Sequence, residues 1–389
     1  MDILLHPRPL SGMVTVIPSK SQAHRLLICA ALADNETILI CPQTSRDMDA
    51  TAQCLCALGA KIQKTAEGYH IQPIAQIPET AVLGCHDSGS TLRFLLPIAG
   101  AMGVDTLFQL EGRLPQRPLS PLWEEMERMG CTLSRPTPDT IRCQGKLKPG
   151  AYSIAGNVSS QFITGLLFAQ SLISGKTSLE ITGKLESKPY VDLTKAAMEL
   201  FQAPHYHSPG TVCVEGDWSN GAFWLAARAL GSHLEIMGLS DDSVQGDRAA
   251  AKWIPELAHQ NCTISAADIP DLVPILSVAA AFGKGAVFTD IARLRLKESD
   301  RIASTIAMLE ALGGGAEASQ ETLTVYPAKL HGGTVDSVND HRIAMAAAVA
   351  ATACTGDVVI LGAECVEKSY PSFWTEYRRL GGNYEQYLR

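Results

Sequence analysis

A segment that recurs six times constrains the fold of this 389-residue chain more than any other feature. Each copy begins with polar side chains and continues as an apolar, alanine-rich stretch of helical length. A second helical stretch follows every copy, and both markers return after about 50–70 residues. Two markers with one rhythm indicate a structural repeat. The copies begin near Ser21, Ser90, Ser160, Asn220, Asp271 and His341, and the second stretches end near Gly59, Gly130, Gln202, Gln260, Gly313 and Gly381.

The repeat also suggests a kind of ligand. Helices that are apolar on most faces are buried, so we expect the six first helices to be central. The first amides of a helix lack partners and its amino end carries positive potential, which favours anions. If the six starts point the same way, they form a field for a highly anionic ligand. The alternative is a repeat scaffold in which polar residues only cap helices.

Composition narrows the class of protein. Hydrophobic residues make up 46% of the chain and charged residues 19%, which is typical of a globular protein. The net charge of −8 argues against a general nucleic-acid binder but leaves room for small anionic substrates. The eleven cysteines form no CxxC pair or zinc-ligand spacing, so we expect a reducing cytoplasm and no metal. No signal region is visible, and the longest uncharged apolar run, 343–355, is too short for a membrane span.

The chain is too long for one ordinary core, so we expect two domains. Alternating runs at 12–17, 212–215 and 323–326 predict strands between the helices, which makes each unit α/β. Six units could close into one ring or form two domains of three. We place the crossing between domains near Glu215 and expect two strands to run directly from one domain to the other.

In the first half of the chain, charge and hydroxyl groups gather at the unit starts. Lys20 and Arg25 flank the first turn of a helix, which suits an anion pocket. Gly89 would let a backbone approach a ligand closely, and Arg117 before proline is held extended for a fixed anion contact. Ordinary caps and solvated loops are the alternatives. The remaining candidates here are Ser21, Ser159, Ser160 and Gln161.

The second half carries acids among its cations. Asp271 lies before a very apolar helix, either as a cap or as a base with a tuned pKa. Lys297 and Arg301 are four residues apart, which predicts a shared helix face, and Glu298 beside them could be an acid in a cationic pocket. Charged residues around Arg342 open another buried helix, and Lys368 lies just before the last one.

In this order, the motifs resemble the 5-enolpyruvylshikimate-3-phosphate (EPSP) synthase family of enolpyruvyl transferases, and the similarity spans essentially the whole chain. The matching motifs are Lys20-Ser21-x-x-His24-Arg25, Gly89 to Arg93, Arg117-Pro118, Ser159-Ser160-Gln161, Ser187-Lys188-Pro189-Tyr190, Lys297-Glu298-Ser299-Asp300-Arg301, Asp340-His341-Arg342 and Lys368-Ser369-Tyr370-Pro371.

The resemblance implies an α/β fold of two similar domains, each made of three βαβαββ repeats with buried helices whose N-termini face an interdomain cleft. One domain would comprise 1–17 and 216–389, and the other 18–215. It implies transfer of the carboxyvinyl group of phosphoenolpyruvate to the 5-hydroxyl of shikimate 3-phosphate, without metal or cofactor. The expected partners are these two small substrates, with no nucleic acid and no membrane, and we expect a monomer.

The resemblance also implies roles for individual residues. The catalytic groups would be Asp271 as base and Glu298, with Lys20, as acid. Shikimate 3-phosphate would bind Lys20, Ser21, Arg25, Ser159, Ser160, Gln161, Ser187, Asp271 and Lys297. Phosphoenolpyruvate would bind Lys20, Gly89, Arg117, Gln161, Arg301, Arg342 and Lys368.

The chain departs from the family pattern at three places. The loop before Lys20 is one residue shorter than in many members, Asp87-Ser88 replaces Asn-Ala before Gly89, and Arg293 stands where many members have Asn. The alternative enzyme within the superfamily acts on UDP-N-acetylglucosamine. That enzyme usually carries a cysteine in the loop before Arg-Pro, whereas the loop from Glu111 to Arg117 has none.

Overall fold

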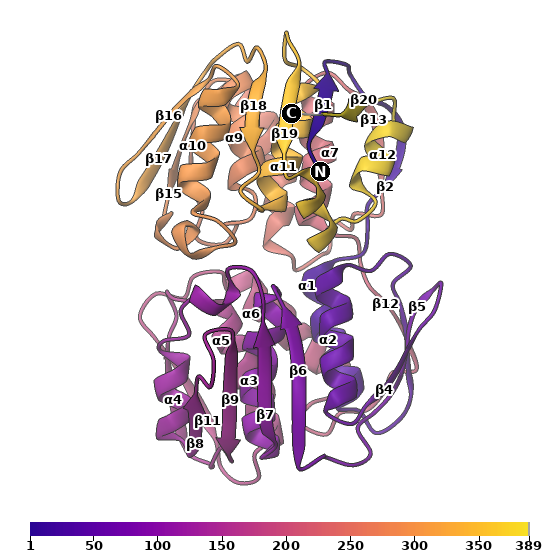
Figure 1. The fold of residues 1–389 in the computed structure, drawn as a ribbon, viewed down its shortest axis with the longest axis vertical. Helices are drawn as coiled ribbons and strands as arrows, with labels where there is room; N and C mark the ends of the chain where they lie inside the picture. The colour runs from indigo at the N-terminus through magenta and orange to yellow at the C-terminus, as the bar shows by residue number, and fades with distance from the viewer. Residues whose placement is uncertain (388–389) are drawn as a thin grey trace. The chain divides into compact units, whose positions relative to one another are not determined.

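The structure is a computed structural model that describes residues 1–387. The residues cluster into two compact units (Figure 1). Unit 1 comprises Met1–Ile17 and everything from Glu215 onwards, and unit 2 comprises Pro18–Val214. Each unit surrounds its own hydrophobic core.

Six helices form the centres of the two cores, as the repeat predicts, and each starts within two residues of the predicted position. Nearly every residue of α3 and all of α11 are buried, because alanine-rich and apolar sequences leave no polar face for water. These helices are α1 (Lys20–Ala31), α3 (Gly89–Met102), α5 (Ser160–Leu172), α7 (Trp218–Ala229), α9 (Val273–Phe282) and α11 (His341–Ala351).

Five of these helices are capped by serine or aspartate. Each cap has a side-chain oxygen that accepts a hydrogen bond from an amide in the first turn, which satisfies one of the unpaired donors there. The capping interpretation of the polar starts is therefore correct as far as it goes, although it does not exhaust their chemistry. The caps are Ser19, Ser88, Ser159, Asp217 and Asp340.

The second helix of each unit is also confirmed. These helices are more amphipathic, as expected of elements that cover a core from outside. They are α2 (Arg46–Ala57), α4 (Leu122–Arg128), α6 (Lys188–Leu200), α8 (Ala250–His259), α10 (Arg301–Ala311) and α12 (Phe373–Arg379), with short 3₁₀ helices η1 (Leu114–Gln116), η2 (Gly246–Ala249), η3 (Ala292–Leu296) and η4 (Ala363–Lys368).

Four four-stranded sheets share one topology: a parallel pair whose second strand continues into two antiparallel neighbours. This is the sheet that one βαβαββ repeat makes. The sheets are β6 (Thr80–His86), β7 (Asp105–Leu110), β9 (Thr140–Gly145) and β8 (Cys131–Ser134); β12 (Thr211–Cys213), β3 (Thr37–Ile40), β5 (Gly68–Gln72) and β4 (Lys61–Lys64); β14 (Cys262–Ser265), β15 (Ala286–Thr289), β17 (Thr322–Tyr326) and β16 (Gly315–Ala318); β18 (Gly333–Asp336), β19 (Val358–Leu361), β1 (Ile3–His6) and β20 (Asn383–Gln386).

The other two sheets contain only the parallel pair within the described residues. They are β10 (Ala151–Ala155) with β11 (Ser178–Thr182), and β13 (His233–Met237) with β2 (Ser11–Thr15). The physical reason is chain length, because the shortest repeats of the sequence lie here and leave no residues for the antiparallel strands. The structure thus differs from six complete repeats at the middle of the chain.

The expectation that two strands run directly between the domains is wrong. β2 ends at Thr15 and pairs only within unit 1, whereas β12 ends at Cys213 and pairs only within unit 2. The chain leaves each unit through short non-strand segments.

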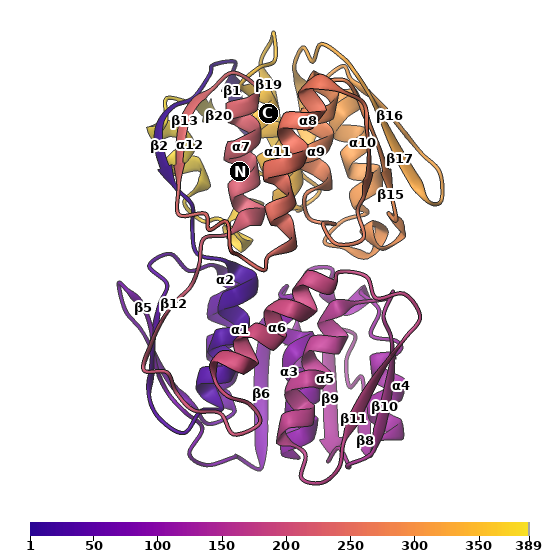
Figure 2. The same cartoon turned by 180° about the vertical axis from the view of Figure 1, so that it is seen from behind.

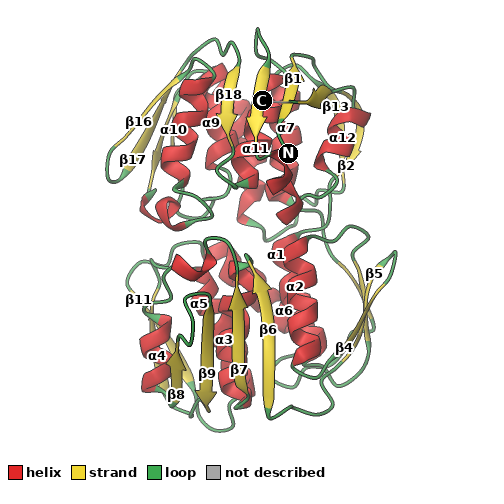
Figure 3. Cartoon of the chain, viewed as in Figure 1, coloured by secondary structure: helices red, strands yellow, loops and turns green. Residues whose placement is uncertain are grey.

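Within each unit the central helices lie between sheets. In unit 2 the β12-β3-β5-β4 sheet lies on one side of α1, α3 and α5, and the β10-β11 sheet lies on the other (Figures 2 and 3). Side-chain hydrogen bonds join the starts of α3 and α5, so the helix starts gather at one end of the unit. The capped starts that carry the predicted site residues are thereby brought together.

Candidate active site

The predicted site residues divide between the two units, and we name each group after one member. The Lys20 half-site in unit 2 contains Lys20, Ser21, Arg25, Gly89, Arg117, Ser159, Ser160, Gln161 and Ser187. The Asp271 half-site in unit 1 contains Asp271, Lys297, Glu298, Arg301, Arg342 and Lys368.

Lys20 begins α1, directly after the Ser19 cap. The Lys20 ammonium donates to Oδ2 of Asp47 at 3.0 Å, and Asp47 lies in the first turn of α2. An ion pair on a partly buried lysine fixes the position of the ammonium. Asp47 was not predicted, because an acid near the start of an ordinary helix carries no local signal in the sequence.

Arg25 lies one turn further along α1 and is almost completely buried, at 2% exposure. Its guanidinium donates to three side-chain or backbone oxygens of α6 and α5: Oγ1 of Thr194 at 2.8 Å, the carbonyl of Tyr190 at 2.8 Å and Oγ1 of Thr164 at 3.4 Å. It also lies 5.0 Å from the centre of the Phe94 ring. Burial lowers the pKa of Arg25 to about 10. A buried cation bound to neutral oxygens gains strongly from an anion.

The starts of α3 and α5 bring three predicted phosphoenolpyruvate residues together. A Cβ added at Gly89 would lie 2.6 Å from Nη1 of Arg117 and 2.7 Å from Nη1 of Arg93, so both guanidinium groups would have to move away from this backbone. Arg93 donates to Oε1 of Gln161 at 2.9 Å, and Gln161 donates to Oγ of Ser90 at 3.0 Å. Arg117 has the extended backbone predicted for a residue before proline. The role of Arg93 inside its motif was not predicted.

The serines of the Lys20 half-site lie at three helix starts, and Ser21 is the second residue of α1. Ser159 accepts a hydrogen bond from the amide of Gln161 at 3.3 Å, and Ser160 is the first residue of α5. Ser187 precedes α6, is buried, and has a left-handed backbone with a φ of 55°. Because non-glycine residues rarely adopt this conformation, the surroundings of Ser187 must hold it there.

Asp271 does not cap α9, so that interpretation of the sequence is wrong. The N-cap position belongs to Leu272, which makes no side-chain cap. The Asp271 carboxylate instead accepts from Nη1 of Arg301 at 2.7 Å and from Nη2 of Arg342 at 2.5 Å, with Nζ of Lys297 at 3.6 Å. Burial would raise the pKa of Asp271, but these three cations outweigh it and hold the pKa well below the usual range.

Arg301 lies at the centre of the Asp271 half-site and has no exposed surface. Its guanidinium donates to three carboxylates: Asp271, Glu298 at 2.6 Å and Asp340 at 3.2 Å. Burial opposes the charge of Arg301, yet the three carboxylates raise its pKa. Arg301 is therefore charged at any working pH, and a substrate anion has to share it with protein carboxylates.

Lys297 and Arg301 do not share a helix face, contrary to the prediction. Lys297 follows η3, whereas Arg301 starts α10, and the residues between them form the turn that places Glu298 on Arg301. The side chain of Lys297 keeps 26% exposure. The removal of most of its water lowers the pKa of Lys297 to about 8, although Asp271 opposes this change. Lys297 thus titrates close to neutral pH.

Arg342 and Lys368 both lie at the start of α11. Nη1 of Arg342 is 2.9 Å from Nε2 of His341, and the amide of Arg342 donates to the cap, Asp340, at 3.0 Å. The ammonium of Lys368, at the end of η4, donates to the carbonyl of Asn339 at 3.1 Å. The two predicted cations of the chain's last repeat are therefore neighbours.

Two buried acids of unit 1 were not among the predicted site residues. Asp340 has no exposed surface and accepts from Ser299, from Arg301 and from the amide of Arg342, so it joins three segments of the half-site. Its place in a quoted motif was the available signal. Burial, and then the negative charge of Asp271, raise the pKa of Asp247 to about 7. No pattern in the sequence marks Asp247.

Two of the three departures from the family pattern, Arg293 and Asp87, have structural neighbours. Nη2 of Arg293 donates to the carbonyl of Ala267 at 3.0 Å, which ties η3 to the segment that precedes Asp271. Asp87 lies against Gly112, where an added Cβ would be 3.1 Å from the Asp87 carboxyl carbon. Both residues thus brace loops beside the half-sites.

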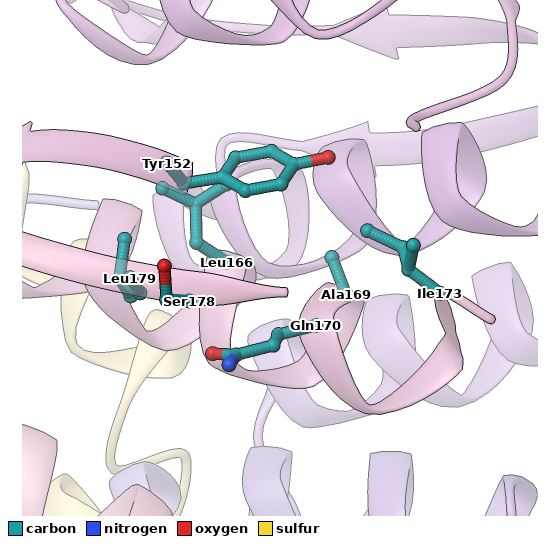
Figure 4. A pocket seen from close by; sticks show the side chains of 7 residues that line it. All are labelled: Tyr152, Leu166, Ala169, Gln170, Ile173, Ser178 and Leu179. Atoms are coloured by element: carbon teal, nitrogen blue, oxygen red, sulfur yellow. The ribbon is translucent and has the colours of Figure 1, made fainter. Parts of the chain in front are cut away.

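A small pocket lies apart from the predicted residues. It is lined by Tyr152, Leu166, Ala169, Gln170, Ile173, Ser178 and Leu179, from β10, α5 and β11 (Figure 4). Within residues 1–387, no three His, Cys, Asp or Glu side chains are grouped so that they could hold a metal ion. No helix in the same range is long and apolar enough to cross a membrane.

Comparison with known proteins shows the family of the chain. Residues 5–377 match the family model described as EPSP synthase (3-phosphoshikimate 1-carboxyvinyltransferase). The chain is 37% identical to the 3-phosphoshikimate 1-carboxyvinyltransferase of Clostridium kluyveri, over 99% of this chain and 98% of that protein, and 36% identical to the Clostridium acetobutylicum protein of the same name, with 99% and 98% covered.

Solved structures share the fold. EPSP synthase from Acinetobacter baumannii matches with a TM-score of 0.80 at 21% identity, covering 99% of this chain and all of that chain. The enolpyruvyl transferase NikO from Streptomyces tendae matches with a TM-score of 0.75 at 17% identity, covering 99% and 98%. At 21% and 17% identity, these structural matches show the fold alone.

Proposed function

Since the chain belongs to the EPSP synthase family, we propose that it transfers the carboxyvinyl group of phosphoenolpyruvate to the 5-hydroxyl of shikimate 3-phosphate and releases phosphate. The family model covers almost the entire chain, and the curated relatives carry the name of this transferase. The reaction belongs to the shikimate pathway, which leads to aromatic amino acids. The two alternatives, a transferase for UDP-N-acetylglucosamine and an anion-binding scaffold, are not favoured.

We assign shikimate 3-phosphate mainly to the Lys20 half-site. The buried charge of Arg25 lacks a carboxylate partner among its contacts and would stabilise the phosphate. The Asp271 half-site would supply contacts to the ring hydroxyls through Asp271 and Lys297. The remaining proposed contacts of this substrate are Lys20, Ser21, Ser159, Ser160, Gln161 and Ser187.

Phosphoenolpyruvate would use groups of both half-sites. Arg301 and Arg342 are directed at the same Asp271 carboxylate, so they already form a two-armed anion clamp. Gly89 removes the side chain that would block a small anion from reaching the backbone and Arg117. The remaining proposed contacts are Lys20, Gln161 and Lys368.

The chemistry is an addition followed by an elimination. Asp271 takes the proton of the 5-hydroxyl while the hydroxyl oxygen forms a bond to C2 of phosphoenolpyruvate. Glu298, with Lys20, delivers a proton to the methylene carbon of phosphoenolpyruvate. The tetrahedral adduct then loses a proton from the new methyl group, and its C2–O bond to phosphate breaks. The cations stabilise the charge on the adduct, which carries the anionic groups of both substrates.

One observation carries this assignment: Asp271, the proposed base, is bonded to the two arginines proposed to hold phosphoenolpyruvate. In this state the low pKa of Asp271 makes it a poor base. A substrate anion that engages Arg301 and Arg342 competes for the same donors, and the pKa of Asp271 then rises. The base would thus become active only when its co-substrate is present.

The test is phosphate release from phosphoenolpyruvate with either shikimate 3-phosphate or UDP-N-acetylglucosamine as acceptor. We expect release with shikimate 3-phosphate alone. Robust turnover of the nucleotide sugar, or none of either, would contradict the proposal.

We further propose that the chain acts as a monomer in the cytoplasm. Its eleven cysteines are all free thiols in the structure, which suits a reducing compartment. Size-exclusion chromatography with light scattering would test the monomer.

A further inference from the structure

A chain of short hydrogen bonds connects three helices inside unit 2 and ends at the start of α3. Nδ1 of His24 lies 2.7 Å from Oγ1 of Thr51, and Thr51 lies 2.7 Å from Oγ1 of Thr91. The Thr91 hydroxyl donates to Oγ of Ser88 at 2.7 Å. These residues come from α1, α2, α3 and the cap of α3, and all four are almost completely buried. None of them is a proposed ligand or catalytic group.

The donor directions along this chain follow from counting protons. Thr91 has one hydroxyl proton, and both of its acceptors, Ser88 and the more distant carbonyl of Asp47, are groups other than Thr51, so Thr91 must accept from Thr51. Thr51 has given its single proton to Thr91 and must accept from His24. His24 therefore carries its proton on Nδ1. Its Nε2 has no hydrogen-bond partner among the described residues. A buried acceptor without a donor costs less free energy than a buried N–H without an acceptor, which agrees with a proton on Nδ1.

The imidazole stays neutral at working pH. His24 is 1% exposed and meets the Phe94 ring edge-on, at 6.2 Å between ring centres. Burial, and then the positive charges of Lys20 and Arg25, lower the pKa of His24 well below its usual value. Neutral histidine protonated on Nδ1 therefore supplies the donor that the network needs without placing another positive charge beside Lys20 and Arg25.

The two ends of the network lie beside proposed ligands. At the His24 end, α1 also carries Lys20, which is paired with Asp47. The backbone carbonyl of Asp47 in turn accepts from the Thr91 hydroxyl at 3.5 Å. At the other end, Ser88 caps α3 immediately before Gly89. Resting on the proposed function for these ligand assignments, we propose that His24 is a positioning residue that holds the Ser88–Gly89 turn in register with α1 for phosphoenolpyruvate.

The shikimate 3-phosphate side should depend less on His24. Arg25 has its own anchors on α5 and α6, through Thr164, Thr194 and Tyr190. Loss of the His24 donor therefore leaves that cation in place, while α1 loses its hydrogen bond to Thr51 of α2 and, through Thr51, its connection to the start of α3. A misplacement of this kind can cost about 100-fold in rate. This asymmetry separates positioning from a general loss of packing.

The experiment compares His24→Leu, His24→Asn and Thr51→Val in the full chain. We expect His24→Leu to lower kcat/KM for phosphoenolpyruvate by about 10- to 100-fold while the Kd of shikimate 3-phosphate changes little. His24→Asn, whose amide can donate to Thr51 from nearly the same position, should retain most of the wild-type kcat/KM for phosphoenolpyruvate. Thr51→Val should add little in the His24→Leu background, because both changes break one network. Thr106→Val is the matched control, since Thr106 is buried and hydrogen-bonded elsewhere in unit 2.

Nitrogen-15 NMR of histidine in the ligand-free protein supplies a readout that does not depend on turnover. We expect His24 to carry its proton on Nδ1, and a proton on Nε2 would overturn the network. Equal losses for both substrates, or full activity of His24→Leu, would overturn the positioning role. If His24→Leu does not fold, His24→Asn and Thr51→Val decide between the same outcomes. Absence of turnover in the wild type would instead refute the proposed function and leave the tautomer test intact.

Discussion

Replacing Asp271 by asparagine should lower turnover but raise the affinity for phosphoenolpyruvate. The variant removes the proton acceptor, so turnover should fall by at least about 100-fold, the usual scale for a general acid–base group. It also removes the negative charge that occupies Arg301 and Arg342 in the empty site. Phosphoenolpyruvate would then no longer compete with a carboxylate, and its binding should tighten.

The size of the tightening follows from the contacts. Asp271 accepts one charge-assisted bond from each arginine, at 2.7 and 2.5 Å, and such bonds contribute about 1.5–3 kcal/mol. Arg301 keeps Glu298 and Asp340 as partners, so the fold survives and only part of this energy becomes available. A gain of about 1.4 kcal/mol corresponds to an affinity about tenfold higher.

Isothermal titration of phosphoenolpyruvate, with and without shikimate 3-phosphate, measures the affinity, and phosphate release measures turnover. Asp336→Asn is the control, because this exposed carboxylate of the same unit accepts a hydrogen bond from the loop amide of Val338 at 2.8 Å and lies outside the half-site. Weaker phosphoenolpyruvate binding in Asp271→Asn would refute the idea that Asp271 and the substrate compete for the arginines.

Three further changes test the Asp271 half-site. Arg301→Met leaves buried carboxylates without their cation and should lower the free energy of unfolding by about 3–5 kcal/mol, which is a Tm loss of about 6–20 °C. The control, Arg295→Met, breaks an exposed ion pair and should cost under about 1 kcal/mol. Equal Tm losses of the two variants in thermal unfolding would contradict the burial argument. Lys297 has its pKa lowered to about 8, so its charge disappears as the pH rises through that value. The Kd of shikimate 3-phosphate should therefore increase above pH 8, and Lys297→Arg should flatten this dependence. Glu298→Gln should lower turnover about 100-fold and slow the exchange of solvent deuterium into the methylene of phosphoenolpyruvate; exchange at the wild-type rate would assign the acid role to Lys20 instead.

The helices of both units could be predicted from the sequence because their signals are local. An alanine-rich apolar run predicts a buried helix, and a serine or aspartate before the run predicts the N-cap of that helix. Ser19, Ser88 and Ser159 lie where this logic places them, and the candidates at those starts follow the caps. The resemblance to a known family rests on the same starts, since the motifs that carry it are mostly the polar turns before buried helices.

The partners of these residues were decided by tertiary structure. Asp271 was expected to be either a cap or a tuned base, and only the packing of α9 against α10 and α11 shows which cations take its carboxylate. Lys297 and Arg301 have helical spacing, yet the turn between η3 and α10 places them on different elements. Spacing along a chain cannot reveal such breaks when neither glycine nor proline marks them.

The positions where helices begin, the chemical groups at their starts and the family of the chain could thus be predicted from local patterns of residues. Which charges meet depends on the folded arrangement of the helices. His24 meets Thr51, and Asp340 meets Arg301, across separations of 27 and 39 residues. Such contacts depend on how buried helices pack, and the energy of packing comes from apolar surface that is shared over the core rather than encoded at either polar residue.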